Sequence, residues 1–216
     1  MYYDIHTHNI TQQQSDTISV FNIYTDFEKI PADFFTAGLH PWYINAATVN
    51  NEMLQLEQLL ANPQLLAVGE CGLDKITATN WQLQTEVFTQ QINLASAYKK
   101  TLIIHCVKAF TETLAMLKAV KTPVIFHGIN NKLSIVQPVI KAGHYLSFGK
   151  TLLQPNPAII EIFLATPLTQ LFLETDDTAA DIKDVYKYAA KIRNIDEKEI
   201  VLQLEENFNK VFHARY

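Results

Sequence analysis

Residues 2–8 read Tyr-Tyr-Asp-Ile-His-Thr-His, a short apolar run that passes directly into two histidines. Aromatic and β-branched residues of this kind are typical of a strand. Similar short runs recur along the whole chain, and no low-complexity or Gly/Ser-rich stretch divides them. We predict eight strands, over residues 2–5, 18–24, 34–39, 65–68, 102–104, 124–126, 145–148 and 171–173.

Most segments between these runs carry apolar residues three and four positions apart, the spacing of a helix that packs against a sheet. This spacing predicts helices over residues 51–61, 81–99, 110–120, 157–165, 182–189 and 201–212. A weaker helix is expected over 131–142, because Pro138 interrupts it. Residues 8–16 carry no helical stripe and are expected to form a loop.

Buried strands that alternate with helices favour parallel pairing. A closed barrel accounts for eight strands, whereas an open doubly wound sheet gives no reason for that number. We therefore predict an α/β fold, a compact (β/α)8 TIM-type barrel built as one domain over residues 1–216. Such barrels typically have ~250 residues, so some helices or loops must be short.

The composition is that of a globular protein, with 48% hydrophobic and 18% charged residues. Its net charge is −5, and no dense Lys/Arg block provides wide phosphate neutralisation. No apolar run approaches the ~20 residues that span a bilayer, and the N-terminal stretch does not resemble a signal peptide. Two cysteines are too few for a secreted disulfide framework. We expect a cytoplasmic protein without membrane contact, and nothing in the sequence implies an obligate protein partner.

Metal-binding side chains follow the predicted strands. Five of the seven histidines and several carboxylates lie at strand ends: His6, His8, His40, Glu70, His105, His127, Glu174 and Asp176. In a parallel barrel these ends meet at one rim, where barrel enzymes build their active sites. The other two histidines, His144 and His213, fall elsewhere. This concentration favours a metal centre over isolated structural histidines.

The spacing of these residues suits divalent ions. His6 and His8 lie two positions apart on an extended strand, so their imidazoles point to the same side. The two oxygens of Glu70 can bridge two cations, and His105 and His127 come from neighbouring strands that can complete a second site. Mixed histidine and carboxylate donors suit Zn2+, Mn2+ or another divalent ion. In the barrel, the eighth strand closes beside the first, which would bring Asp176 to face the histidine pair.

Six segments occur in a set order: DIHTH (4–8), GLHPW (38–42), AVGECGLD (67–74), LIIHC (102–106), VIFHG (124–128) and FLETDD (172–177). Together with ENFNKVF (206–212), they resemble the TatD family of metal-dependent deoxyribonucleases, which are amidohydrolase-like barrels. The resemblance implies hydrolysis of phosphodiesters at the ends of DNA or RNA, with two divalent ions (Mg2+, Mn2+ or Zn2+). It implies one ion held by His6, His8, Glu70 and Asp176, and another held by Glu70, His105 and His127. His40 would line the substrate pocket.

Other residues near these motifs have two interpretations each. Trp42 either stacks on a base or packs its own loop, and Lys150 either contacts a phosphate or is a solvated surface lysine. Asp4 either orients a ligand imidazole or closes the first turn of the barrel. Asp74 holds a substrate-side water or, with slightly more support, fixes the loop after the fourth strand. Glu174 is expected behind the ligands, since the eighth strand needs only one.

The sequence therefore predicts a two-metal phosphodiesterase that acts on nucleic-acid ends. Glu70 and Asp176 would be its catalytic carboxylates, with Asp176 serving as ligand and as proton acceptor. The alternative is an amidohydrolase or esterase for a small molecule, but relatives of that kind usually have a modified lysine where this chain has Glu70. A catalytically weak scaffold is the third candidate, and the full ligand set argues against it.

Overall fold

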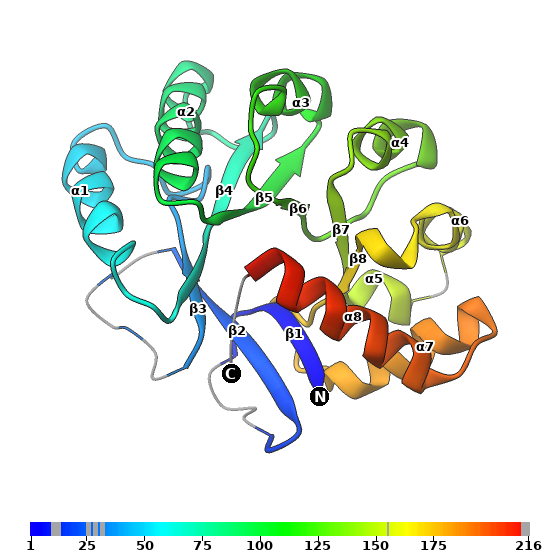
Figure 1. The fold of residues 1–216 in the computed structure, drawn as a ribbon. Helices are drawn as coiled ribbons and strands as arrows, with labels where there is room; N and C mark the ends of the chain where they lie inside the picture. The colour runs from blue at the N-terminus through cyan, green and yellow to red at the C-terminus, as the bar shows by residue number, and fades with distance from the viewer. Residues whose placement is uncertain (10–13, 25–26, 28–29, 31–32, 155, 213–216) are drawn as a thin grey trace. The chain divides into compact units, whose positions relative to one another are not determined.

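A computed structural model describes residues 1–9, 14–24, 27, 30, 33–154 and 156–212. The strands are β1 (Tyr2–Thr7), β2 (Thr17–Ile23), β3 (Phe35–Ala37), β4 (Leu65–Asp74), β5 (Thr101–Val107), β6 (Val124–Phe126), β7 (Tyr145–Phe148) and β8 (Leu171–Leu173). The helices are α1 (Val49–Leu59), α2 (Trp81–Ala97), α3 (Phe110–Leu117), α4 (Leu133–Lys141), α5 (Lys150–Leu153), α6 (Pro157–Ala165), α7 (Ile182–Arg193) and α8 (Glu197–Phe212). A short 3-10 helix, η1 (Leu168–Gln170), precedes β8. The eight predicted strands and the predicted helices are present, and α5 is an addition (Figure 1).

The strands form one sheet in the order β1 to β8. The pairs β1–β2, β3–β4, β4–β5 and β7–β8 are parallel. Thr7 of β1 also forms a parallel bridge with Asp176, just after β8, so the last strand adjoins the first. A sheet of this order alternating with helices is a (β/α)8 barrel, which confirms the predicted fold class.

Contacts along the chain define two compact units. The first contains Met1–Phe21 and Phe126–Tyr216, and the second contains Asn22–Ile125. The boundaries fall inside β2 and β6. The first unit thus includes β1, β7, β8 and helices α4 to α8, whereas the second includes β3 to β5 and helices α1 to α3. The organisation of residues 1–216 as one domain stays a prediction.

In the first unit, the C-terminal helices pack beside β1 and β8. Helices α7 and α8 lie side by side (Figure 1). The ring of Phe208 on α8 lies 4.5 Å from that of Tyr3 on β1. The hydroxyl of Tyr186 on α7 donates to the Tyr3 carbonyl (3.2 Å) and accepts the Tyr3 N–H (3.1 Å). The position of β1 is therefore fixed by both an aromatic contact and backbone hydrogen bonds.

The start of helix α6 is fixed by a capping residue that can be seen in the sequence. The Asn156 side chain accepts the N–H of Ala158 at 3.1 Å, and Pro157 occupies the first turn of α6, which spans the predicted residues 157–165. Pro138 lies inside α4 without ending it. Pro157 therefore lies at a helix start, whereas Pro138 lies in a helix interior.

Asn207 on α8 supports η1 and the start of β8 through two hydrogen bonds, one part-buried and one buried. Its side chain, 2% exposed, donates to the carbonyls of Leu168 (2.7 Å) and Leu171 (2.9 Å). We expect Asn207→Ala to lower the free energy of unfolding by about 1–3 kcal/mol, because both carbonyls lose the Asn207 amide, although Leu168 still accepts the Leu171 N–H. Urea denaturation measures this, with the exposed Asn209→Ala on the same helix as the matched control. Equal stability of the two variants would contradict the role given to Asn207.

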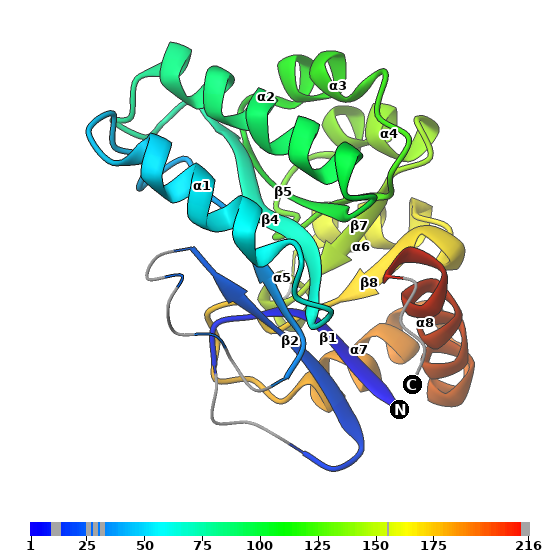
Figure 2. The same ribbon diagram turned by 60° about the vertical axis from the view of Figure 1, so that its left-hand side comes forward.

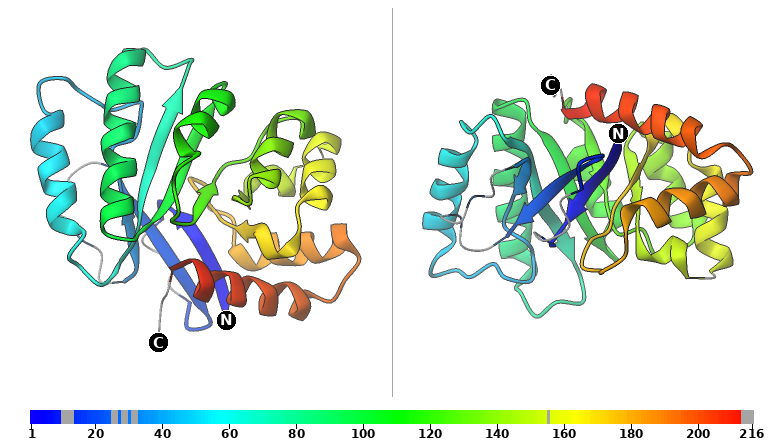
Figure 3. Two further views of the ribbon diagram at one scale, coloured as in Figure 1. Left: turned by 45° about the horizontal axis from the view of Figure 1, so that its top comes forward. Right: turned by 90° about the horizontal axis from the view of Figure 1, so that it is seen from below.

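In the second unit, α2 lies along β4 (Figures 2 and 3). Two glutamines on its buried face bind the backbone of other segments. Gln84 accepts the Asp74 N–H at 2.9 Å and donates to the Asp74 carbonyl at 3.1 Å. Gln91 makes the same pair of bonds with Leu39, at 2.8 and 3.1 Å. Helix α2 thus holds two of the segments that carry candidate site residues of this unit, the one with His40 and the one with Glu70 and Asp74.

Helix α2 is shorter than the predicted helix over residues 81–99. The helix ends at Ala97 and Tyr98 is 42% exposed, so this tyrosine does not belong to the buried face.

Among the described residues, no helix is both long enough and apolar enough to cross a bilayer.

Candidate metal centre

The first unit brings together His6, His127 and Asp176, each of which offers a donor atom within 4.8 Å of the others. The rings of His6 and His127 lie 4.3 Å apart. The Oδ1 atom of Asp176 is 3.8 Å from His6 Nε2 and 3.5 Å from His8 Nε2. His6 and His8, two apart at the end of β1, therefore approach the same carboxylate, as their spacing predicts.

The backbone of β1 holds Asp176 from both sides. The Asp176 N–H donates to the His6 carbonyl (2.9 Å), and the Asp176 carbonyl accepts the His8 N–H (3.0 Å). Asp176 adopts a left-handed conformation with φ of 54°. Aspartate tolerates this conformation better than most residues. The bridge therefore aims the carboxylate back at the two histidines that it links.

Asp4 fixes the residue before Asp176. Its carboxylate, 4% exposed, accepts the Thr175 N–H (2.9 Å) and the Thr175 hydroxyl (2.6 Å). Burial raises the pKa of Asp4 to about 7, although these hydrogen bonds act to lower it. These contacts tie β1 to the end of β8, which matches the interpretation of Asp4 as a residue that closes the first turn.

Glu174 lies behind His127. Its Oε1 accepts the Gly128 N–H at 2.8 Å and lies 3.7 Å from His127 Nδ1. Burial acts to raise the pKa of Glu174, but the imidazoles of His127 and His6 hold it below its ordinary value. A carboxylate in this place can orient the His127 ring, as outer partners of metal-binding histidines do.

Lys150 begins α5 beside the same group. Its Nζ lies 2.5 Å from Asp177 Oδ1 and 3.9 Å from Asp176 Oδ2, and the side chain is 44% exposed. The carboxylate of Asp177 raises the pKa of Lys150, so the ammonium is charged. The structure thus places Lys150 next to a candidate ligand, and its contact with a phosphate stays a prediction.

The second unit brings together His40, Glu70 and His105, whose donor atoms also lie within 4.8 Å of one another. Glu70 Oε1 is 3.0 Å from His40 Nε2 and 2.8 Å from His105 Nδ1. Gly72 permits this arrangement, since a Cβ there would lie 2.1 Å from the His105 carbonyl and its φ is +140°. The close pairing of β4 and β5 therefore depends on this glycine.

Asp74 determines which nitrogen of His105 carries the proton. Its Oδ2 accepts the Trp42 Nε1–H at 2.6 Å and lies 3.1 Å from His105 Nε2, and its Oδ1 accepts the Ile76 N–H at 2.8 Å. Burial acts to raise the pKa of Asp74, but these hydrogen bonds hold it below its ordinary value. An ionised carboxylate only accepts hydrogen bonds, so Nε2 of His105 is the donor and Nδ1 keeps a lone pair for a metal in the neutral ring.

The geometry at His105 fits a cation. Its Nδ1 lies 2.8 Å from Glu70 Oε1 and 3.3 Å from His40 Nε2, so two acceptor atoms and one imidazole N–H meet at this point. A cation bound by Nδ1 and Oε1 would remove the repulsion between these two acceptors. In octahedral coordination, two neighbouring ligands at ~2.1 Å from one ion lie at right angles to each other and about 3.0 Å apart. Glu70 and His105 can therefore occupy adjacent positions around a divalent ion.

His40 is held in the opposite tautomer. Its Nδ1 accepts the Trp42 backbone N–H at 3.1 Å, so Nε2 carries the proton of the neutral ring and can donate to Glu70. This arrangement suits the prediction that His40 lines the substrate pocket rather than binds the metal. The Trp42 ring, 52% exposed, lies edge-on to His40 and donates to Asp74. Trp42 thus packs its own loop, and its stacking on a base stays a prediction.

Sequence reasoning gave too little weight to Asp74 and did not find Gln84. The signal for Asp74 was its place at the end of the Gly-Glu-Cys-Gly-Leu-Asp segment that contains Glu70. Gln84 gave no signal, since a glutamine within a helix is usually exposed.

The thiols of Cys71 and Cys106 are not candidates for catalysis, because burial raises the pKa of Cys71 far above its ordinary range and that of Cys106 to about 11.

We expect Asp74→Asn to weaken metal binding at Glu70 and His105 by roughly 10–100-fold, the usual effect of losing an outer partner of a ligand histidine. The amide cannot accept all three hydrogen bonds and no longer favours the Nδ1 lone pair of His105. Competition with a chromophoric Zn2+ chelator measures the affinity, and Asp184→Asn at an exposed site is the control. Unchanged affinity in Asp74→Asn would show that Asp74 does not act on His105.

Each unit taken by itself thus contains one donor group of predicted ligands. Bridging of two ions by Glu70 and the sharing of one ion by His127, Glu70 and His105 stay predictions. His144 lies before β7, where burial lowers its pKa, and belongs to neither group. His213 and residues 10–13 of the predicted first loop lie outside the described residues.

Histidine and carboxylate groups after the strands of a (β/α)8 barrel indicate a metal-dependent enzyme, since the active sites of this fold lie at these strand ends. The chain belongs to the TatD-related DNase family, whose match covers residues 6–213. It is a metal-dependent hydrolase of this family, which confirms the resemblance seen in the sequence motifs.

Similar proteins agree with this family. An uncharacterized metal-dependent hydrolase of Buchnera aphidicola is 26% identical over 196 residues, which cover 82% of this chain and 73% of the relative. The human 3′–5′ RNA nuclease TATDN2 is 31% identical over 148 residues, 64% of this chain and 19% of that protein. The crystal structure of the TatD homologue YjjV from Escherichia coli K12 has the same fold, with a TM-score of 0.85 at 19% identity and coverage of 99% of this chain and 98% of that chain.

Proposed function

We propose that this chain is a two-metal phosphodiesterase, a deoxyribonuclease or ribonuclease that removes nucleotides from nucleic-acid ends. The observation that carries the proposal is the Glu70–His105 contact, in which Glu70 Oε1 and His105 Nδ1 lie 2.8 Å apart, a spacing that suits two neighbouring ligands of one divalent ion. The family name and the nuclease activity named for the human relative support the substrate class.

The proposed ligands follow from the donor groups. One ion would be held by His6, His8 and Asp176 with Glu70, and the other by Glu70, His105 and His127. Divalent ions there, Mg2+, Mn2+ or Zn2+, would supply Lewis-acid polarisation of the phosphodiester and a water of lowered pKa. They would also attract phosphate to a chain whose net charge is −5.

The chain's own residues would position the substrate and move protons. Asp176, fixed by the backbones of His6 and His8, would accept the proton of the attacking water. His40 would donate its Nε2–H to the substrate, and the Lys150 ammonium would contact a phosphate oxygen. Trp42 would present its exposed ring to a base. We also propose a cytoplasmic location.

The test separates this function from the small-molecule alternative. Purified protein, analysed for bound metal, is assayed with bis-p-nitrophenyl phosphate, with a panel of esters, lactones and amides, and with 3′- and 5′-labelled single and double strands. Each assay is run with Mg2+, Mn2+ and Zn2+. Metal-dependent shortening of labelled strands from one end supports the proposal. Hydrolysis of esters or amides without any phosphodiesterase activity would favour an amidohydrolase.

A further inference from the structure

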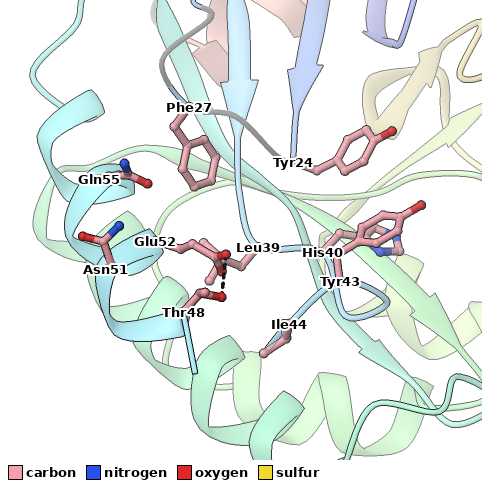
Figure 4. A pocket seen from close by; sticks show the side chains of 10 residues that line it. All are labelled: Tyr24, Phe27, Leu39, His40, Tyr43, Ile44, Thr48, Asn51, Glu52 and Gln55. Atoms are coloured by element: carbon pink, nitrogen blue, oxygen red, sulfur yellow. Dashed lines mark hydrogen bonds between the residues drawn. The ribbon is translucent and has the colours of Figure 1, made fainter. Parts of the chain in front are cut away.

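A second feature of the Asn22–Ile125 unit is a cavity of about 210 Å³ beside the Glu70–His105 group. Its walls come from residues after β2, from the segment after β3 and from the first two turns of α1 (Figure 4). Of the residues given a role above, His40 is the one that lines this cavity.

One side of the cavity is aromatic. The rings of Tyr24 and Tyr43 are stacked, with centroids 5.1 Å apart and planes at 21°. Tyr43 is 50% exposed, and its ring lies 5.5 Å from that of His40. Leu39 and Ile44, which also line the cavity, are both buried. A flat ring that enters this space meets aromatic and aliphatic surface, which favours stacking of a heterocycle.

The opposite side is polar and presents acceptors. The Thr48 hydroxyl donates to Glu52 Oε1 at 2.9 Å, and the side chains of Asn51 and Gln55 stand beside Glu52 on α1 (Figure 4). Among the described lining residues there is no lysine or arginine. A phosphate is therefore disfavoured here, whereas a neutral group with N–H donors suits the carboxylate of Glu52.

The volume sets the size of the occupant. An apolar cavity of about 150 Å³ binds benzene, so 210 Å³ holds one aromatic heterocycle and not a whole nucleotide. His40 connects this space to the metal ligands, since its Nε2 lies 3.0 Å from Glu70 Oε1. A ring in the cavity would therefore leave its attached phosphate near Glu70.

We infer that this cavity binds the base of the terminal nucleotide, with a preference for bases that carry an exocyclic amino group. Guanine, adenine and cytosine can donate an amino N–H to Glu52, whereas uracil and thymine have only a ring N–H. This inference rests on the proposed nuclease function for the identity of the substrate. Binding of a base is measured separately from hydrolysis, so each can fail alone.

The binding experiment uses calorimetric titration of the purified protein with guanosine, adenosine, cytidine and uridine, and with ribose as the base-free probe. We expect the amino-bearing nucleosides to bind more tightly than uridine, and ribose not to bind. Tyr43→Leu should weaken nucleoside binding about tenfold, since stacking of one base contributes roughly 1–3 kcal/mol. Glu52→Gln should reduce the preference over uridine. Tyr98→Leu, at an exposed tyrosine outside the cavity, is the matched control and should bind nucleosides as tightly as the parent does.

The hydrolysis experiment compares oligonucleotides that end in a base with otherwise identical strands that end in an abasic site. Tyr43→Leu should raise KM for the base-ended strand about tenfold and should remove the advantage of that strand over the abasic one. Equal nucleoside binding by the parent and Tyr43→Leu, or no nucleoside binding at millimolar concentrations, overturns the inference even where DNA or RNA is cleaved. Nucleoside binding that depends on Tyr43 without hydrolysis of any phosphodiester supports the cavity as a base site and refutes the proposed function.

Discussion

Glu70→Gln is expected to release metal and to abolish most hydrolysis. The Gln carbonyl can take the place of Oε1 and still accept the His40 Nε2–H, so the packing of this buried side chain is preserved. The amide lacks the negative charge that balances a cation facing His105 Nδ1. The loss of metal affinity should therefore exceed the roughly 10–100-fold typical of losing an outer partner.

If Glu70 bridges two ions, both should be weakened. Metal stoichiometry after dialysis, melting temperature and phosphodiesterase rate are measured on one preparation. Glu112→Gln is the matched control, because this carboxylate forms an exposed ion pair with Lys75 that contributes at most ~1 kcal/mol. Unchanged stoichiometry and activity in Glu70→Gln would remove Glu70 from the site, and loss of a single ion would show that it does not bridge.

The positions of the strands followed from the sequence because each begins with an apolar run, but their ends did not. The predicted fourth strand stops at Val68, whereas β4 continues to Asp74. Most residues from Gly69 to Asp74 are polar or small, yet β5 extends the strand through pairs that run from Cys71–Ile104 to Asp74–Val107. Local propensity does not register a partner strand supplied from elsewhere in the chain.

The candidate ligands could be predicted from the sequence, whereas the residues that support them could not. A histidine at the end of a buried run stands out, and the barrel topology brings such ends together. The role of Asp74 depends on which ring nitrogen of His105 faces it, and that is fixed only by the fold. Gln84 and Gln91 were overlooked because the 3.6-residue pattern counts apolar residues, whereas these two glutamines are buried by bonding to backbone groups of other segments.

The short helix α5 was missed because four residues carry no measurable period. It matters for the site, since it begins with Lys150, whose ammonium lies 3.9 Å from Asp176 Oδ2. The sequence could place Lys150 after the seventh strand. It could not show that Asp177 holds the ammonium in that position at 2.5 Å.

Asp176→Asn is expected to lower turnover by about 10²–10⁴, the range for a positioned general base. Asparagine keeps the size and one acceptor oxygen, and it also tolerates the left-handed backbone at this position. The two backbone bonds with His6 and His8 do not involve the side chain, so the fold should survive. The variant loses only the charge and the basicity of the carboxylate.

Three measurements on one preparation separate the catalytic role of Asp176 from a structural one. The ion assigned to Glu70, His105 and His127 should remain bound, while the phosphodiesterase rate falls. Asp184→Asn, an exposed site on α7, controls for the chemistry of the substitution, and His144→Ala controls for a histidine outside both donor groups. Both controls should keep the metal content and turnover of the parent.

If Asp176 only supported the end of β8, its variant would melt earlier by the equivalent of ~1 kcal/mol and still hydrolyse at the parental rate. That outcome would rule out Asp176 as the proton acceptor and would weaken the two-metal proposal.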